Sequence, residues 1–533
     1  MKRRVGILTP KTTLESCYAE IVEQLAKDPD IELILLHDRG APKPSTLHEK
    51  SYRFLFGLEK KVLSKISSEV RTHTPDVDIT GLFHTETILI SGHYGTNSLT
   101  YSPKDLTAIQ NAGLDLILHL DTEYPLAGEI VETGAKDGIV GMFTARKTAF
   151  WQTYRQEDSV SFSIEQYKKG NNRVLITGAL NTMRFVTEMR VRLIRESGAF
   201  LIRFIRAYAK SGQLDFRTHP NPTLFDTEAP ATPKVSQQLH YILNTGILFG
   251  KLIFKRVLLR QQSRFGVAFL WKNWEDAKLS QGVEIKTPDN HFYADPFVWK
   301  QENRVVCFLE DYDYTTHLAC VTAVELFEDG SYTILGEVVK EPFHLSFPYL
   351  FTYENELYMI PESTASESIR LYKCTAFPMQ WEYQYDLMKD VRAADTMLFP
   401  YEGRWWMLTN ISTENNYDQA AQLYAFYSDS PLSTEWKPHR ANPVAFSSAY
   451  GRNGGILFTR EHIPVRGRQK QKFNIYGAAF SIAKIKELTP EKFCEETLAE
   501  IEPRFFPGIE ATHHIHSHGD ITVYDFMRQE RVH

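Results

Sequence analysis

The last half of this 533-residue chain repeats one short pattern about every 50 to 60 residues. Each copy is an apolar strand, a short polar turn and a second apolar strand, which is the pattern of a β-hairpin. The five copies are DPFVWKQENRVVCFLEDY (295–312), FPYLFTYENELYMIPES (347–363), DTMLFPYEGRWWMLTN (395–410), NGGILF (453–458) with a basic insertion at 464–472, and THHIHSHGDITVYDF (512–526). Repeats of this length and strand content are typical of β-propeller blades, so we expect an all-β five-bladed propeller over residues 263–533.

One further strand precedes the first copy. The stretch RFGVAFLW, residues 264–271, is apolar and β-rich. If it pairs with the last copy, it closes the ring and removes the open sheet edges that promote aggregation. We therefore predict that residues 264–271 complete the fifth blade.

Length and composition are those of a folded protein with two or three domains. The chain is 43% hydrophobic and 24% charged, and its formal net charge of -6 gives no overall attraction for nucleic acid. The five cysteines are scattered without CxxC spacing, which indicates neither a disulfide framework nor a zinc site. We expect no nucleic-acid partner, no metal and no cofactor.

The N-terminal sequence MKRRVGILTP has only a short apolar run, broken by Pro10, and reads as a first strand rather than a secretory signal. No uncharged apolar stretch approaches the roughly 18 to 20 residues that cross a bilayer. We expect a cytoplasmic protein, with peripheral contact to the inner face of the membrane left open.

The first third of the chain has the pattern of an α/β domain. Residues 4–9, 14–27 and 31–36 read as strand, helix and strand, the βαβ unit of a Rossmann-type parallel sheet, and 86–91 and 114–119 are further strand candidates. Ligands in such sheets bind beyond the carboxyl ends of the strands. Those ends carry Thr9 and Lys11, Ser91 and His93, and residues 121–124.

Residues 113–143 and 150–167 resemble, in layout, the N-terminal domain of the methionyl-tRNA and sugar formyltransferases. The shared features are a buried strand, a loop with Tyr124-Pro125-Leu126, a short helix, a Gly-Ile/Val strand and a Trp-containing segment. Where that family carries its catalytic histidine, this chain has Met142-Phe143-Thr144, and it has no equivalent of the catalytic aspartate. Without the groups that activate an amine, we predict for residues 1–180 a formyltransferase-like domain that holds structure or ligand but transfers no formyl group.

The middle of the chain, residues 181–262, is predicted to be helices and linker. Residues 182–210 and 237–260 have apolar residues at helical spacing, interleaved with arginines and lysines, and a polar, Pro-rich stretch at 211–234 separates them. Such helices either pack with solvated basic side chains or lie on an anionic membrane surface. Both alternatives stay open.

The propeller pattern predicts where a functional site lies. The first strand of every blade lines the central channel, so the residues that head these strands converge on one mouth. Asp295 and Asp395 head two of them, and a purely structural protein has little reason to aim carboxylates at one apolar-walled point. The other polar candidates are Ser346 with His344, Arg452 with Asn453, one or more of His513, His514 and His516, and Glu310, Asp311 and Glu362 at the ends of second strands.

The blade pattern resembles the five-bladed furanosidase-type glycoside hydrolases, in which an Ala-Asp-Pro supplies the general base and an aspartate of blade three tunes it. Asp295 and Asp395 match those positions. The family's acid, a glutamate of blade four, is replaced by Arg452-Asn453-Gly454-Gly455. Because such hydrolysis needs two carboxyls, a hydrolase would have to use Asp295 together with Glu362.

A further resemblance is to the propeller-like N-terminal region of the plant glucosamine inositolphosphorylceramide transferases and its bacterial relatives. The matching stretches are HFYADPF, FLEDYDY, PFHLSFPYLF, LYMIPES, FPMQW, EGRWWML and the late Arg-Asn-Gly-Gly. The resemblance implies a carbohydrate-directed protein of surface polysaccharide or glycoconjugate assembly.

We therefore expect a glycosyl-transfer enzyme that takes a sugar or nucleotide-sugar and a glycan acceptor, with Asp295 as the base and with Asp395 and Arg452 holding the substrate. A glycoside hydrolase and a non-catalytic glycan-binding scaffold are the alternatives. Exposed aromatic side chains would stack on sugar faces, the candidates being Phe292, Tyr293, Tyr312, Tyr349 and Trp405. The sequence does not predict the oligomeric state.

Overall fold

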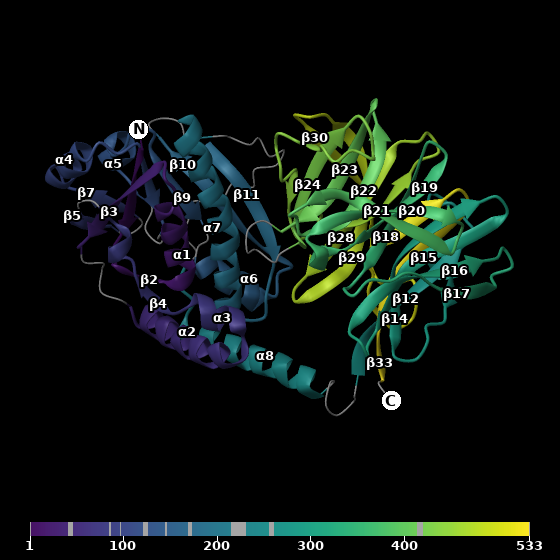
Figure 1. Ribbon diagram of the computed structural model, residues 1–533. Helices are drawn as coiled ribbons and strands as arrows, with labels where there is room; N and C mark the ends of the chain where they lie inside the picture. The colour runs from purple at the N-terminus through teal and green to yellow at the C-terminus, as the bar shows by residue number, and fades with distance from the viewer. Residues whose placement is uncertain are drawn as a thin grey trace. The chain divides into compact units, whose positions relative to one another are not determined.

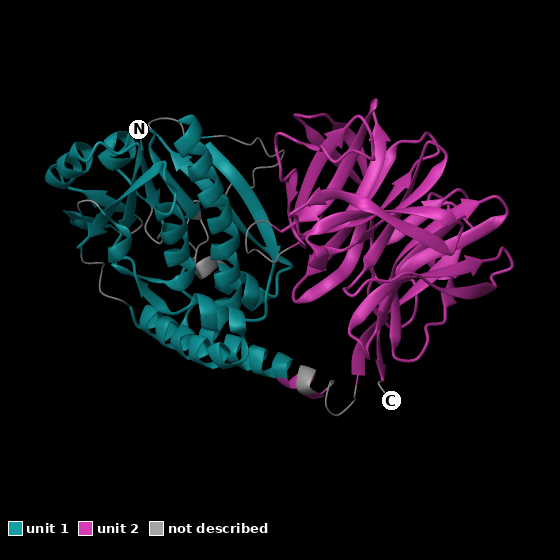
Figure 2. Ribbon diagram, viewed as in Figure 1, with its two compact units in different colours: residues 1–249 teal, residues 250–533 magenta. Residues whose placement is uncertain are grey.

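A computed structural model describes residues 2–40, 46–84, 87–95, 98–120, 126–143, 146–168, 173–214, 231–254, 261–412 and 419–531. The chain divides into two compact units, residues 1–249 and 250–533 (Figure 2). The predicted loops at 121–124 and 144, and residues 215–230 of the predicted linker, lie outside the described residues. The predicted division at 180 and 262 stays a prediction.

The first unit is built on a mostly parallel sheet with the strand order β11-β10-β9-β8-β1-β3-β5 (Figure 1). Its parallel strands are β1 (Arg3–Thr9), β3 (Ile31–Asp38), β5 (Ile88–Ile90), β8 (Leu116–His119) and β9 (Ile139–Phe143). Strands β10 (Ser159–Tyr167) and β11 (Arg173–Asn181) extend the sheet antiparallel. The chain builds the sheet outward from β1 to β3 and β5, and then adds β8 and β9 on the other side of β1. The order therefore reverses between β1 and β8.

Helices and short strands surround this sheet, and their ends follow local sequence signals. Helix α2 begins with a capping box of Thr46 and Glu49, and α4 begins with Ser102 as its cap and proline at its first position. The helices are α1 (Ser16–Ala26), α2 (Leu47–Ile66), α3 (Ser68–His73), α4 (Pro103–Asn111), α5 (Glu129–Thr133) and α6 (Arg146–Arg155), and the short strands are β2 (Thr13–Glu15), β4 (Asp76–Asp78), β6 (Gly92–Tyr94) and β7 (Leu99–Tyr101).

Helix α7 (Val186–Ser211) is a core element of the first unit. Most of its apolar side chains are buried, and it ends at Gly212, whose φ of 71° suits a residue without a side chain. Its arginines have partners inside the unit: Arg190 pairs with Glu15, and Arg195 Nη1 lies 3.0 Å from Glu69 Oε1. The segment 182–210, for which the sequence left open packing or membrane contact, therefore packs within the first unit.

Helix α8 (Val235–Ile253) contacts α2 through two side chains and leaves apolar side chains exposed. The Gln238 side-chain amide donates to the carbonyl of His48, and Tyr241 bonds to Glu59. Large apolar side chains of both helices face solvent, namely Leu47, Phe54, Leu58, Val62 and Ile66 of α2 and Leu239, Ile242, Leu243, Ile247 and Phe249 of α8. Within the described part of the chain, no helix combines the length and hydropathy needed to span a membrane.

The second unit is a propeller of five sheets, as the repeats predict. Four blades are formed by consecutive strands: β14 (His291–Gln301), β15 (Arg304–Asp313), β16 (Leu318–Leu326) and β17 (Tyr332–Val339); β18 (Ser346–Tyr353), β19 (Glu356–Glu362), β20 (Ser368–Ala376) and β21 (Gln380–Lys389); β22 (Ala393–Tyr401), β23 (Arg404–Ile411), β24 (Gln422–Ser428), β25 (Lys437–Pro438) and β26 (Ala445–Phe446); and β27 (Asn453–Phe458), β28 (Pro464–Lys472), β29 (Ile475–Leu488) and β30 (Phe493–Ile501).

The fifth blade joins the two ends of the propeller sequence. Strand β12 (Gln261–Leu270) pairs antiparallel with β33 (Ile521–Arg531), from Gln261 opposite Arg531 to Leu270 opposite Thr522. Strands β13 (Val283–Ile285), β31 (Ile509–Ala511) and β32 (Ile515–His518) complete the sheet. The prediction that residues 264–271 close the ring is confirmed.

The basic segment of blade four is a buried strand, which corrects its interpretation as an insertion. Residues 464–472 form β28, between β27 and β29. Arg466 is fully buried and pairs with Glu495, with Nε 2.6 Å from Oε1. The sequence did not predict this strand, because Glu495, the partner of Arg466, belongs to β30, two strands further along the blade.

Four inner strands carry a β-bulge at equivalent positions, between Ala294 and Phe297, Ser346 and Tyr349, Ala394 and Met397, and Asn453 and Ile456. The bulges place Asp295, Phe347 and Asp395 at φ values of 47°, 45° and 47°, in the left-handed region. That conformation costs a residue other than glycine about 1–2 kcal/mol. Bulges re-aim side chains and are frequent beside active sites, and two of the three strained residues here are the predicted catalytic aspartates.

Candidate active site

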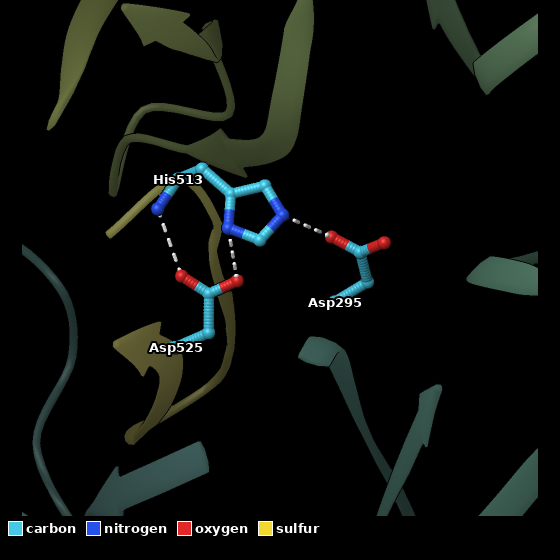
Figure 3. Close-up of side chains that lie close together, drawn as sticks. All are labelled: Asp295, His513 and Asp525. Atoms are coloured by element: carbon cyan, nitrogen blue, oxygen red, sulfur yellow. Dashed lines mark hydrogen bonds and ion pairs between the residues drawn. The ribbon is translucent and has the colours of Figure 1, made fainter. Parts of the chain in front are cut away.

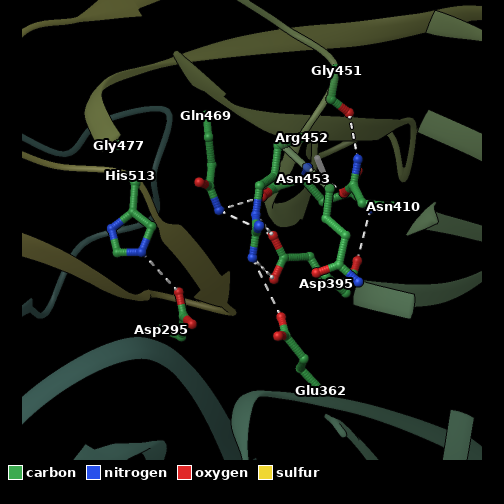
Figure 4. A network of polar contacts seen from close by, with 12 residues as sticks. Asp295, Glu362, Asp395, Asn410, Gly451, Arg452, Asn453, Gln469, Gly477 and His513 are labelled. Carbon is green, nitrogen blue, oxygen red and sulfur yellow. Dashed lines mark hydrogen bonds and ion pairs between the residues drawn. The ribbon is translucent and has the colours of Figure 1, made fainter. Parts of the chain in front are cut away.

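Asp395 and Arg452 form a buried ion pair at the heads of β22 and β27 (Figure 4). Arg452 Nε lies 2.7 Å from Asp395 Oδ2, and its Nη2 lies 3.4 Å from Oε2 of Glu362. Asp395 is only 1% exposed. Glu362 ends β19, so three blades contribute charged groups to one cluster, as predicted.

The side-chain amides of Asn453 and Gln469 hold Asp395 in place through hydrogen bonds. The Asn453 side-chain amide donates to the carbonyl of Asp395 at 2.7 Å, and the backbone N–H of Asn453 donates to Asn410 Oδ1 at 2.9 Å. Gln469 Nε2 donates to Asp395 Oδ2 at 3.1 Å. Asn453, predicted to bind substrate, therefore holds the blade-three aspartate in place.

A second charged group brings Asp295 together with His513 and Asp525 (Figure 3). His513 lies in the break between β31 and β32, with Nε2 3.3 Å from Asp295 Oδ1 and Nδ1 2.6 Å from Asp525 Oδ2. The backbone N–H groups of His513 and His514 donate to Asp525 Oδ1, which holds the break open. Of the three candidate histidines, the fold selects His513 as the neighbour of Asp295.

The three side chains are close enough to suggest a metal site, but their arrangement fits an ion-pair relay better. The imidazole lies between the two carboxylates, so each of its nitrogens faces a different one (Figure 3). A metal ion needs ligand atoms that converge on a single point. This geometry instead favours a protonated imidazole shared by Asp525 and Asp295.

Burial and neighbouring charges shift the pKa values in this cluster. Burial raises the pKa of Asp295 well above its usual range, although His513 opposes the shift. Burial also raises the pKa of Asp395 to about 7 against the opposing charge of Arg452. Burial alone would lower the pKa of His513, but Asp525 and Asp295 outweigh it and raise the pKa to about 9. A carboxyl with a raised pKa is a stronger base, which suits general base catalysis near neutral pH.

Tyr476 connects the two charged groups. Its ring lies 5.4 Å from the guanidinium carbon of Arg452 and 5.6 Å from the ring centre of His513. Although 46% of Tyr476 is exposed, desolvation raises its pKa well above the usual value, so the phenol keeps its proton. The neutral ring of Tyr476 therefore lies beside both cations, Arg452 and His513.

Glu310, Asp311, His344 and Ser346 lie at the adjoining strand ends. His344 Nε2 lies 3.2 Å from Glu310 Oε1, and burial, which lowers the pKa of His344, is outweighed by that glutamate, so the pKa is raised. Asp311 already has two partners, His291 and the Thr322 hydroxyl. Ser346 pairs in register with Glu362.

His514 and His516 face apolar surroundings rather than the charged groups. The His514 ring packs against Phe297 and Phe347, with ring centres 4.6 Å and 5.2 Å away. His516 Nδ1 accepts the backbone N–H of Val298 at 3.1 Å. Burial lowers the pKa of His514 well below its usual value and that of His516 to about 3, so both rings are neutral. The structure does not bring them to the carboxylates.

Some of the aromatic candidates for sugar stacking are buried in the core, and others lie partly exposed near the mouth of the propeller. Tyr293 and Tyr349 are buried, and Trp405 pairs with Pro400 near the hairpin end of blade three, away from Asp395. Phe292 and Tyr312 stack on each other with ring centres 4.6 Å apart and are partly exposed. This pair lies next to His344, whose ring centre is 6.0 Å from that of Tyr312.

Sequence reasoning missed Asp525, Tyr476, Gln469 and Asn410. Asp525 had a readable signal, because a lone aspartate in the apolar run ITVYDF of a predicted strand is expected to need a buried partner. Tyr476, Gln469 and Asn410 carried no such signal, since they are neutral residues of the second and third strands of their blades, β29, β28 and β23, rather than of the inner strands.

Residues 280–505 match the sequence model of the family described as glucosamine inositolphosphorylceramide transferase 1, N-terminal. The match contains Asp295, Glu362, Asp395, Arg452 and Tyr476 but not His513. Proteins named glucosamine inositolphosphorylceramide transferase 1 from Oryza sativa subsp. japonica and Arabidopsis thaliana are 34% and 32% identical to this chain over 209 residues. Those residues are 39% of this chain but only 28% and 27% of the plant proteins.

Solved structures with some likeness include a family 117 glycoside hydrolase of Zobellia galactanivorans and an α-L-arabinanase of Penicillium chrysogenum. The first is 11% identical with a TM-score of 0.34, covering 50% of this chain and 90% of the hydrolase. The second is 12% identical with a TM-score of 0.30, covering 44% and 77%.

Proposed function

We propose that the mouth of the propeller catalyses the transfer of a sugar to a hydroxyl group of a glycan or glycolipid acceptor, in surface polysaccharide or glycoconjugate synthesis. The observation that carries the proposal is the buried relay Asp295–His513–Asp525 beside the Asp395–Arg452 pair. The names of the plant relatives, which describe glucosamine transfer involving inositolphosphorylceramide, support this class of reaction.

In the proposed reaction, Asp295 accepts the proton of the acceptor hydroxyl. The hydroxyl oxygen forms a bond to the anomeric carbon of the donor, while the bond from that carbon to the leaving group breaks and the leaving group keeps the electron pair. Protonated His513 compensates the charge of Asp295 before the transfer. The raised pKa of Asp295 increases its strength as a base.

The charge balance of the mouth suits hydroxyl groups and a reacting centre that develops positive charge. The cluster has four carboxyls, Asp295, Glu362, Asp395 and Asp525, against the two cations Arg452 and His513. Arg452 already pairs with two of the carboxyls, so its role in the proposal is to position Asp395. A sugar with developing positive charge at its anomeric carbon fits such a site.

Hydrolysis with Asp295 and Glu362 is the second candidate. The observation that favours it is the place of Glu362 in the same cluster, 3.4 Å from Arg452. Arg452 already pairs with this carboxyl, so Glu362 would have to leave the pair to reach a glycosidic oxygen, which is why we rank transfer first.

The experiment is a transfer assay with the full chain. A panel of nucleotide-sugars is incubated with phosphoinositol-containing and oligosaccharide acceptors, and products are identified by mass spectrometry. Transfer predicts an acceptor heavier by one sugar that disappears with Asp295→Asn. Release of free sugar without acceptor would establish hydrolysis instead, and tight glycan binding without any product would leave only the scaffold alternative.

We also propose that the exposed apolar face of α2 and α8 binds an anionic bilayer. Lysines flank the apolar side chains, among them Lys50, Lys61 and Lys65 of α2 and Lys251 of α8. Apolar side chains rimmed by basic ones are the pattern of interfacial helices. Peripheral contact of this kind would bring the protein to a lipid-linked acceptor.

Vesicle sedimentation tests this surface. The protein should sediment with phosphatidylserine-containing vesicles more than with neutral ones, and Leu239→Glu with Leu243→Glu should abolish the difference. Leu498→Glu, an exposed leucine of β30, is the matched control. Equal sedimentation of the control and the double variant would contradict the membrane proposal.

For the first unit, we propose a formyltransferase-like domain without formyl transfer. Met142, at the position expected for the catalytic histidine, is a buried residue of β9. Its thioether has no proton to exchange. Absence of formyl transfer to amino sugars by the full chain is the expected result, and detection of it would contradict the assignment.

A further inference from the structure

A cavity of about 360 Å³ lies at the carboxyl end of the parallel sheet of the first unit. Thr9, the last residue of β1, and Lys11, in the loop after it, line the cavity from one side, and Leu120, directly after β8, lines it from the other. The strand order reverses between β1 and β8. Such a reversal leaves a crevice in which open α/β sheets bind ligands.

The cavity is lined by more basic than acidic side chains. Its cations are Lys11, Arg53, Lys60 and Arg190, and its acids are Glu15 and Asp76. Lys60 and Arg190 both pair with Glu15, which fixes these three side chains within the protein. The lining therefore has a surplus of two positive charges.

Lys11 and Arg53 are the cations left for a ligand. In the described part of the chain, the side chain of neither has an ion pair or a hydrogen bond. They approach the cavity from different elements, Lys11 from the loop after β1 and Arg53 from helix α2. Two separate cations suit a ligand with more than one negative charge, and arginine suits phosphate in particular.

The remaining wall is aromatic and apolar. Tyr18, Tyr52, Phe56 and Leu14 line the cavity together with the charged groups. The rings of Tyr52 and Phe56 lie 4.3 Å apart. An aromatic wall beside paired cations fits a molecule with a flat ring at one end and phosphates at the other.

We propose that this cavity binds a nucleoside diphosphate, with the phosphates on Lys11 and Arg53 and the base against Tyr52 and Phe56. The loop after β1, TPKTT, has no glycine, so its backbone cannot wrap closely around a phosphate as a glycine-rich loop does. The phosphates are therefore recognised by the side-chain cations of Lys11 and Arg53. The proposal concerns the first unit alone and does not depend on the reaction at the propeller.

Isothermal titration calorimetry on the full chain tests it, with UDP, GDP and ADP as probes and with pyrophosphate as the competitor. Wild-type protein should bind at least one of the nucleotides, and pyrophosphate should displace it while binding more weakly. Lys11→Gln combined with Arg53→Gln should weaken binding about tenfold or more, because two charge-assisted contacts are lost. The control is Lys104→Gln with Lys210→Gln, which removes the same charge from exposed positions of α4 and α7 and should leave affinity within about twofold.

A third variant separates this site from the propeller. Asp295→Asn should bind the nucleotide as the wild type does, whatever its effect on transfer. The proposal is overturned if no nucleotide binds, if both double variants weaken binding equally, if pyrophosphate binds as tightly as the nucleotides, or if Asp295→Asn abolishes binding.

Discussion

His513 Nε2 lies 3.3 Å from Asp295 Oδ1, and the opposite nitrogen of the same ring lies 2.6 Å from Asp525 Oδ2. Asp295 belongs to the first blade and His513 and Asp525 to the last, so the contact spans the closure of the ring. One imidazolium compensates two buried carboxylates. The charge of Asp295 is therefore coupled to the protonation of His513.

Asp295→Asn should reduce turnover by about 10²–10⁴ while changing the Tm little, because the amide has nearly the same shape but is no base. Asparagine also tolerates the φ of 47° at this position. Asp390→Asn is the control, since Asp390 is exposed and has a similar φ of 55°. Steady-state rates and thermal unfolding check the pair. Full turnover by Asp295→Asn would remove this residue from the chemistry.

His513 should stabilise the fold in a pH-dependent way. Its pKa rises from 6.5 to about 9 on folding, because Asp525 and Asp295 overcome the effect of burial. A raised histidine pKa gives stability that is fully present below pH 6.5 and is lost as the pH rises through about 9. The full contribution is on the order of 3 kcal/mol. The Tm difference between wild type and His513→Gln should therefore be largest near pH 6 and shrink toward pH 9.5, and a difference that grows with pH would contradict the ion-pair arrangement.

Arg452→Met should cost about 3–5 kcal/mol of unfolding free energy at pH 8, because it leaves Asp395 buried without its cation. The loss should be smaller at pH 5. Burial already raises the pKa of Asp395 to about 7 with Arg452 present, so the carboxyl takes up a proton readily when the arginine is gone. Adding Asp395→Asn should restore part of the stability at pH 8. Denaturant unfolding at both pH values measures this, and an equal loss at each would show that the charge of Asp395 is not the cause.

A disulfide between β12 and β33 should form and stabilise the propeller. Gln529 Nε2 donates to Ser263 Oγ at 2.9 Å, and the two residues are partners in register. Ser263→Cys with Gln529→Cys should oxidise readily and raise the free energy of unfolding of the propeller by about 2–4 kcal/mol, since the bond joins its two ends. Each single variant is a control. Thiol titration and unfolding with and without reductant test the pairing, and two thiols that stay reduced would argue against this register.

The blade count and the ring closure could be predicted because they follow from local patterns. Alternating apolar strands and polar turns mark each hairpin, and the surplus strand at 264–271 needs a partner. The aspartates of the inner strands β14 and β22 were found in the same way. The bulges at these aspartates could not be predicted, because the left-handed φ of Asp295 and Asp395 depends on how neighbouring strands pair.

The choice among His513, His514 and His516 could not be made from the sequence. Alternation along a regular strand would place His514 and His516 on one face and His513 on the other. Asp525 breaks the strand by accepting two backbone N–H groups, and this long-range contact decides which ring meets Asp295. The interpretation of residues 464–472 as an insertion is wrong for a related reason, since Glu495 becomes the neighbour of Arg466 only in the folded blade.

Because β12 pairs with β33, the ring can close only after the last strand of the propeller has been translated. Asp295, Asp395 and Arg452 emerge early, whereas His513 and Asp525 are among the last parts of the propeller to be translated. Until they arrive, Asp295 lacks its compensating cation. In the proposed reaction a nascent propeller is therefore inactive, and Asp295, the proposed base, gains its compensating cation only when the final strand has docked.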